Sequence, residues 1–155
     1  MKFTRTALLG VAAAVTAGSV VFAASHANVE GAIKARKAHM GLNAFNLGIL
    51  GNMAKGDMAY DAAAAQTAAD NLAALAAMNT AAYWPAGSSL ADVENTRAKA
   101  EMWDNFPDVM EKVAALASAT EAMAAAAGTL EGVQANMGAI GGACGACHQA
   151  YRQSN

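Results

Sequence analysis

The clearest chemical signal in this chain is Cys144–Gly145–Ala146–Cys147–His148, close to the C-terminus. Two cysteines separated by two residues and followed at once by histidine form the attachment pattern of a covalently bound haem. On a helix, residues three apart share a face, so both thiols can reach the two vinyl groups of one porphyrin. The imidazole of His148 can then bind the iron from one side. The sequence therefore predicts one covalent haem c per chain.

Three other interpretations of the cysteine pair are less well supported. Cys144 and Cys147 are the only cysteines, and in an exported protein such a pair often forms a disulfide. A thioredoxin-like dithiol would follow a strand and lie near the start of a helix, whereas this pair lies near the end of a helical chain. A zinc site would need a fourth ligand at regular spacing, which neither His26 nor His39 supplies. The adjacent histidine favours haem.

Residues 1–23 have the parts of a secretory signal peptide: a basic start, an apolar run over residues 7–22 and small residues after it. We expect cleavage after Ala23, with Ala24 and Ala27 as alternatives. A membrane anchor is the other interpretation, but the run is short for a span. Since c-type haem is attached outside the cytoplasm, the leader and the haem motif together predict a periplasmic protein.

The expected mature domain, residues 24–155, is a single acidic unit. Removal of the leader lowers the number of basic residues from 10 to 8 against 12 acidic ones, a formal charge of −4. No cluster of Lys and Arg resembles a nucleic-acid interface. No second apolar stretch is long enough to cross a bilayer, so we expect the mature protein to be soluble.

The mature sequence is dominated by good helix formers and lacks strand-like alternation. Asp57 or Asp61 can cap a second helix, Pro107 suits the first turn of a third, and Thr129 can cap a fourth. Four helices with mostly short connections predict an all-α fold, an antiparallel four-helix bundle with the haem near the C-terminal helix. The expected segments are residues 28–54, 57–78, 107–127 and 129–152, with a loop at residues 83–89.

The third and fourth segments each carry one stripe of apolar or small residues that would face a shared core. In the third these are Val109, Val113, Leu116, Thr120 and Met123; in the fourth they are Val133, Met137, Ile140, Cys144, Cys147 and Tyr151. Other methionines such as Met110 are expected to fill the core. Because the chain is rich in alanine and has nine aromatic residues, such a core would be thin without a large apolar group such as haem.

The first segment differs because it has two apolar faces. One face contains Val29, Ile33, Met40, Ala44 and Leu47; the nearly opposite one contains Leu42, Phe45, Ile49 and Met53. A monomer needs only one such face, so the second predicts a homodimer through this helix. The alternative is that the second face packs within the same bundle.

Glycine is unusually frequent in the haem-bearing segment, at Gly138, Gly141, Gly142 and Gly145. Each costs about 1 kcal/mol of helix stability against alanine. This cost indicates that the backbone passes close to a flat group, although a weak helix end is an alternative explanation.

A haem motif so near the C-terminus resembles that of cytochrome c′ and its relatives, the class II c-type cytochromes. The resemblance covers about residues 28–155. It is carried by residues 144–152 and by the first-segment sequence of residues 32–40, in which Arg36 precedes Met40 by four. Further matches are residues 54–56, 60–63 and 85–87, and Trp103.

The resemblance implies several roles beside the haem. Arg36 would pair with a propionate, for which a guanidinium is well shaped, and Lys37 would lie beside the haem. Thr96 or Arg97 would supply a second propionate contact. Arg152 would lie close to the proximal imidazole. Ordinary solvated helix charges are the alternatives for Arg36 and Arg152.

Met40 matches the residue that stands over the second axial face of the iron. In cytochrome c′ this residue only covers a five-coordinate, high-spin iron, which binds nitric oxide or carbon monoxide. In a low-spin branch of the family a methionine binds the iron as a sixth ligand and suits electron transfer. Methionine occurs in both roles. His39 is a rival ligand by chemistry, but it points about 100° away around the helix.

The leading hypothesis is a periplasmic haem protein, not an enzyme, that binds nitric oxide or carbon monoxide and passes single electrons to an unidentified redox partner. The second is a low-spin electron carrier with His148 and Met40 on the iron. An enzyme acting on nitric oxide or peroxide is a third, for which we find no acid–base pair apart from His39. A haem that serves only as a structural filler is the fourth.

Overall fold

The computed structural model describes the backbone of residues 18–154 and side chains from residue 28. Within that range the chain forms helices and no strand, apart from one isolated bridge between Ala98 and Arg152. No described helix is both long and apolar enough to cross a membrane. The predicted leader falls mostly outside the described residues. The elements are α1 (Gly18–Lys55), α2 (Ala62–Ala77), η1 (Ala81–Tyr83), α3 (Glu101–Asp104), α4 (Phe106–Ala126) and α5 (Leu130–Tyr151).

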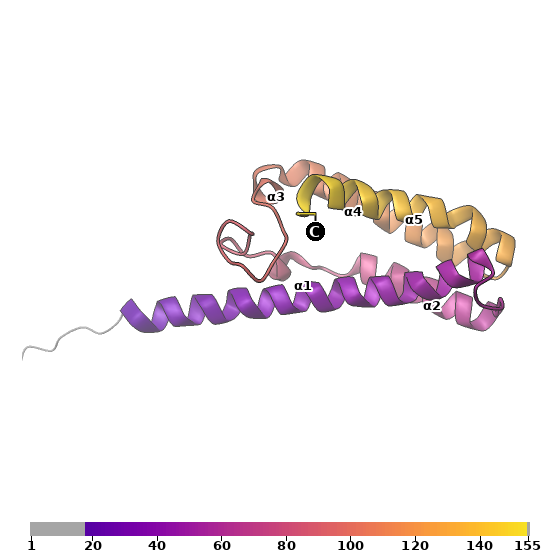
Figure 1. The fold of residues 1–155 in the computed structure, drawn as a ribbon, viewed down its shortest axis with the longest axis horizontal. Coiled ribbons are helices and arrows are strands. Elements are labelled where there is room, and N and C mark those ends of the chain that lie inside the picture. The colour runs from indigo at the N-terminus through magenta and orange to yellow at the C-terminus, as the bar shows by residue number, and fades with distance from the viewer. Residues whose placement is uncertain (1–17, 155) are drawn as a thin grey trace, which may run out of the picture.

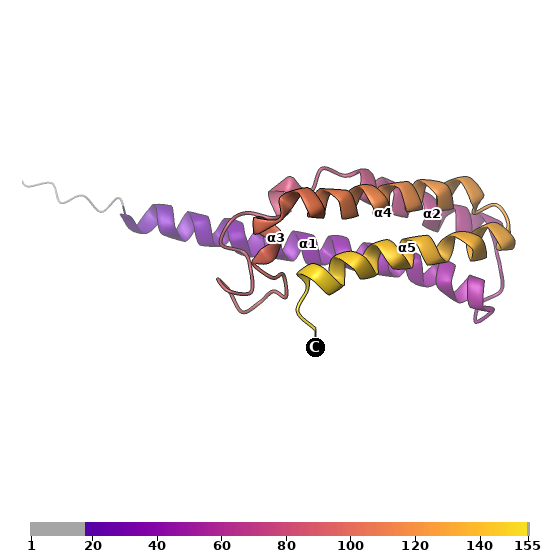
Figure 2. The ribbon, with the colours of Figure 1, turned by 90° about the horizontal axis from the view of Figure 1, so that it is seen from above.

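The four long helices form the predicted antiparallel bundle. α1 packs against α2 and α5, and α4 packs against α2 and α5. Figures 1 and 2 show two layers, α1 with α2 and α4 with α5. The layers lie close together at the end with the α1–α2 and α4–α5 turns and diverge toward the other end. We call these the closed end and the open end. The long segment between α2 and α4, which includes η1 and α3, lies at the open end.

Local signals fix where the helices begin and end. Asp61, not Asp57, caps α2, because its carboxylate accepts a hydrogen bond of 2.8 Å from the N–H of Ala64. The hydroxyl of Thr129 likewise accepts from Gly132 at the start of α5, at 3.1 Å. Pro107 lies in the first turn of α4, as predicted. The segment predictions are therefore confirmed to within a few residues, except that α1 begins at Gly18 and α3 was not foreseen.

The core is divided into two clusters. The large one lies toward the closed end and is rich in alanine, as the composition predicted; it contains Leu50, Met53, Ala65, Ala68, Ala69, Leu72, Ala119, Met123, Ala127, Val133 and Ile140. The small one lies at the open end, where Met102, Val109 and Tyr151 are buried against Trp84, Trp103 and Cys147. The haem-binding turn of α5 lies where the two clusters meet.

Two predictions about helix faces were wrong. Val113 and Met110 of α4 are exposed, although both were expected in the core. Met53 was assigned to the outward face of α1 but is buried in the large cluster, and Ile49 packs against it. Met40, expected on the opposite face, is exposed. Met53 and Met40 lie on nearly opposite faces of α1, and the face that carries Met53 is the one that the large cluster covers toward the closed end.

Candidate haem site

Cys144 and Cys147 are three residues apart, so their thiols lie on the same face of α5. Cys144 packs against the large cluster and Cys147 against the small one. Both are half-buried free cysteines, and burial raises the pKa of each thiol. The α5 helix therefore places two thiols, which are not joined in a disulfide, between the clusters. That arrangement fits the predicted thioether attachment.

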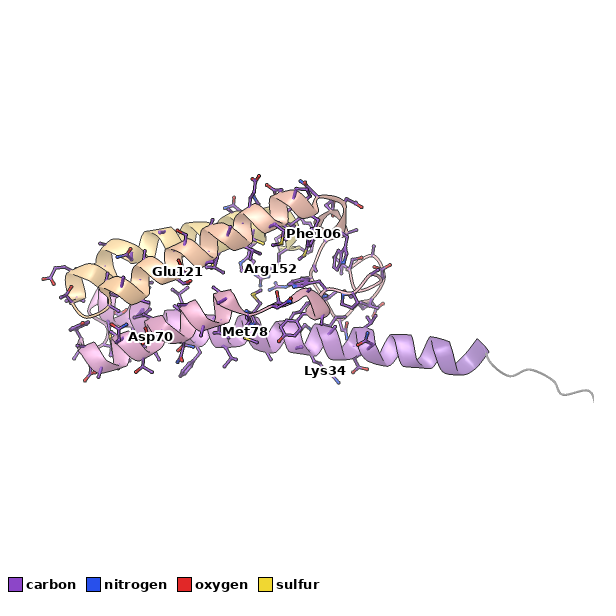
Figure 3. The ribbon with its side chains drawn as sticks, turned by 180° about the vertical axis from the view of Figure 1, so that it is seen from behind. Lys34, Asp70, Met78, Phe106, Glu121 and Arg152 are labelled. Atoms are coloured by element: carbon purple, nitrogen blue, oxygen red, sulfur yellow. The ribbon has the colours of Figure 1, made fainter. Side chains whose placement is uncertain are left out.

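His148 is exposed on the last turns of α5. With Arg152 and Lys99 it lines an open hollow of about 500 Å³; the other lining residues are Gly145, Gln149, Gln153 and Ser154. Figure 3 shows Arg152 at the open end of the bundle, where Met78 also lies at the end of α2. The structure thus places His148, the predicted axial ligand, and Arg152 around one hollow.

Arg36 of α1 is only 4% exposed and is held by the loop between α2 and α4. One terminal nitrogen donates to the hydroxyl of Ser88 at 2.8 Å and to the carbonyl of Tyr83 at 3.4 Å. The other donates to the carbonyl of Ser88 and to Oγ1 of Thr96, both at 2.6 Å. The guanidinium also lies 4.8 Å from the ring centroid of Trp84. Arg36 therefore ties α1 to this loop, a role that the resemblance did not imply.

The charge of Arg36 has no acidic partner among the described residues. All four of its hydrogen bonds go to neutral oxygens, and burial lowers its pKa. A buried cation without a counter-ion is costly, so an anion beside it would be stabilised. The two propionates of haem are such anions. This is the observation of the structure that best fits a haem at the open end.

Thr96 is buried, and its hydroxyl oxygen accepts a hydrogen bond from Arg36. Lys37 is exposed on α1, and Met40 is 45% exposed one turn after Arg36. His39 is half-buried, with its ring centroid 6.1 Å from that of Tyr83, and burial lowers its pKa. The ring contact ties His39 to the loop, whereas Met40 belongs to neither core cluster.

Several residues of the site were missed by sequence reasoning. Ser88 and Trp84 complete the surroundings of Arg36, and Trp103 donates a hydrogen bond of 3.1 Å to the carbonyl of Trp84. Asp108 of α4 accepts a short hydrogen bond from the hydroxyl of Tyr151. Only the run of turn residues around Pro85 marked this loop as a distinct feature.

Four glycines of α5 have open space where a side chain would begin. At Gly138, Gly141, Gly142 and Gly145, a Cβ atom would meet nothing within 4 Å. Packing within the described chain does not require glycine there. The flat group that we expect beside this helix would be the haem.

Comparison with known proteins gives one consistent family. The family model described as cytochrome c′ matches residues 31–152. A cytochrome c-554 from Cereibacter sphaeroides is 40% identical over 128 residues, which cover 82% of this chain and 84% of that protein. A cytochrome c′ from the same organism is 37% identical over 131 residues, which cover 84% of this chain and 88% of that one.

Solved structures agree. A cytochrome c′ structure from Rhodobacter sphaeroides superposes with a TM-score of 0.80 at 36% identity and covers 82% of this chain and 98% of its own. Another, at 30% identity and a TM-score of 0.74, is described as having ligand-controlled dimer dissociation. A third, a ferrous variant from Alcaligenes xylosoxidans at 29% identity and a TM-score of 0.71, is described with bound nitric oxide. Each of these two covers 81% of this chain and 97% of its own.

Proposed function

The chain belongs to the cytochrome c′ family and carries covalent haem c; from this premise we propose that it is a periplasmic protein that binds nitric oxide or carbon monoxide and passes single electrons. Haem supplies the one-electron couple and the iron at which a gas binds. The proposal assigns no catalytic residue. It accords with the family of one-electron carriers to which the chain belongs.

In this proposal the chain supplies one axial ligand and leaves the other face open. His148 binds the iron, while Cys144 and Cys147 form the thioethers. Arg36 balances the propionate charge from its buried position on α1. Lys37 and Arg152 would make weaker contacts with the haem. Thr96 would act indirectly, because its hydroxyl accepts a hydrogen bond from Arg36.

The observation that carries the open face is the environment of Met40. Met40 packs into neither core cluster of the described chain, and in this proposal it covers the second axial face of the iron and moves aside when a small gas enters. The similar structure that is described with bound nitric oxide supports the same proposal.

Optical and electron paramagnetic resonance spectra of the haem-loaded protein test this proposal directly. We expect a high-spin spectrum, rapid binding of carbon monoxide to the reduced protein, and faster binding in Met40→Ala, because the smaller side chain uncovers the iron. Met58→Ala is the matched control in the α1–α2 turn at the closed end, since Met58 is exposed to a similar degree. A low-spin spectrum with a sulfur-to-iron band that Met40→Ala removes would instead establish the low-spin electron carrier.

We also propose a homodimer through α1. Leu42 and Phe45 are 53% and 66% exposed on this helix. Leu42 also lines a groove of about 340 Å³ between α1 and α2, together with Asn46, Asn71, Ala74, Leu75 and Met78. The similar structure with ligand-controlled dimer dissociation supports the same assembly. Met53 and Ile49 have no part in it, because both pack within the bundle.

Charged substitutions on this face test the dimer. Leu42→Lys with Phe45→Glu should convert a sedimenting dimer into a monomer, because the charges would be desolvated in the interface. Phe106→Lys with Met110→Glu places the same charges on an exposed part of α4 and should leave the mass unchanged. A dimer that survives the α1 substitutions would exclude this face as the interface.

A further inference from the structure

The last turn of α5, which carries His148, is held from two directions. The buried side chain of Tyr151 donates its hydroxyl hydrogen to Asp108 of α4. The backbone carbonyl of Tyr151 accepts from the N–H of Lys99 at 2.9 Å, and the N–H of Gln153 donates to the carbonyl of Arg97 at 2.8 Å. One contact ties the turn to α4 and the others tie it to the loop that also holds Arg36.

Asp108 is well suited to this contact. It lies in the first turn of α4, where the helix dipole favours a negative charge. Its second carboxylate oxygen accepts from Nζ of Lys112 at 3.1 Å. The hydrogen bonds from Tyr151 and Lys112 lower the pKa of Asp108, and the carboxylate raises the pKa of Tyr151 to about 12. A neutral phenol therefore meets a charged acceptor at ordinary pH, which is the strong form of the hydrogen bond.

Tyr151 is placed to orient the residues that precede it. It follows Cys147 by four and His148 by three, so the three side chains occupy adjoining positions of the same turn. Tyr151 and Cys147 also pack in the same small cluster. Any rotation of this turn about the α5 axis would break the contact with Asp108, and it would move the imidazole of His148 at the same time.

We propose that Asp108 and Tyr151 are positioning residues for the axial histidine, which hold the last turn of α5 so that the His148 imidazole keeps one orientation toward the iron. The inference rests on the proposed role of His148 as iron ligand. Groups that orient a metal ligand also tune the metal centre, and their substitution typically costs about 10- to 100-fold in metal affinity or activity. Tyr151→Phe leaves every charge in place, including the Asp108–Lys112 pair, so the effect of this variant acts through orientation and not through net charge.

The test compares haem-loaded Tyr151→Phe and Asp108→Asn with Tyr60→Phe. Tyr60 is the matched control because its hydroxyl donates a hydrogen bond of 2.8 Å to the carbonyl of Ala127 at the closed end. We expect all three variants to unfold at lower denaturant concentration. Only Tyr151→Phe and Asp108→Asn should shift the g-values of the ferric electron paramagnetic resonance spectrum and the midpoint potential.

Each outcome decides one question. Loss of stability in Tyr151→Phe without any spectral or potential shift would make the pair merely structural and overturn the inference. Asp108→Asn keeps an oxygen acceptor, so a smaller shift than that of Tyr151→Phe supports orientation as the cause. Carbon monoxide titration of the unsubstituted protein tests the open axial face separately, because the ferric spectrum reports imidazole ligation whether or not a gas binds.

Discussion

Replacement of both Cys144 and Cys147 by serine should release all of the haem into acidified organic solvent, whereas the unsubstituted protein should retain it through denaturation. The structure shows two free thiols on one helical face, and a thioether is a covalent bond that survives unfolding. Serine keeps the size of the side chain but forms no thioether. Haem staining of a denaturing gel, with the intact mass of the chain, measures the result.

The single variants give the matched comparison. Cys144→Ser and Cys147→Ser should each retain haem through the remaining thioether, with a shifted absorption band because one vinyl group stays unsaturated. Haem that remains covalently bound in the double variant would mean that another side chain forms the attachment, and the motif would have been misread.

Replacement of Arg36 by leucine should lower the free energy of unfolding by about 2–4 kcal/mol, since it removes four hydrogen bonds at a buried site and leaves acceptors of the loop without a donor. Arg36→Lys keeps the charge but cannot form the same fork, so its loss should be intermediate. Urea unfolding of the haem-loaded protein measures both.

Lys34→Leu is the control for Arg36 on the same helix. Lys34 is exposed and forms only a surface ion pair of 2.7 Å with Glu30, so its loss should stay below about 1 kcal/mol. Equal effects at the two positions would show that the buried contacts of Arg36 with the loop do not stabilise the fold.

The sequence by itself determined the features that are local. The haem motif needs only the spacing of Cys144, Cys147 and His148 on one helix, and that spacing does not depend on the rest of the fold. The starts of α2 and α5 depend on Asp61 and Thr129 and the N–H groups three residues later. The four main helices and the all-α class followed from propensity and turns, because these four helices are long and regular.

Contacts between distant segments could not be predicted in the same way. Arg36 and Thr96 are 60 positions apart, and Asp108 and Tyr151 are 43 apart. Helical periodicity predicts which residues share a face, but it does not predict which element covers that face. The resemblance to cytochrome c′ identified Arg36 as important but gave it a propionate, not a loop, as its partner.

Only the tertiary structure decided which faces are buried. Met53 and Met40 both lie on α1, yet Met53 is in the core and Met40 is exposed. Met53 lies near the closed end, where Figure 1 shows the two helix layers close together, whereas Met40 lies nearly opposite around the helix and nearer the open end, where the layers diverge. Divergence of this kind depends on how all four helices pack together, and no single segment encodes it.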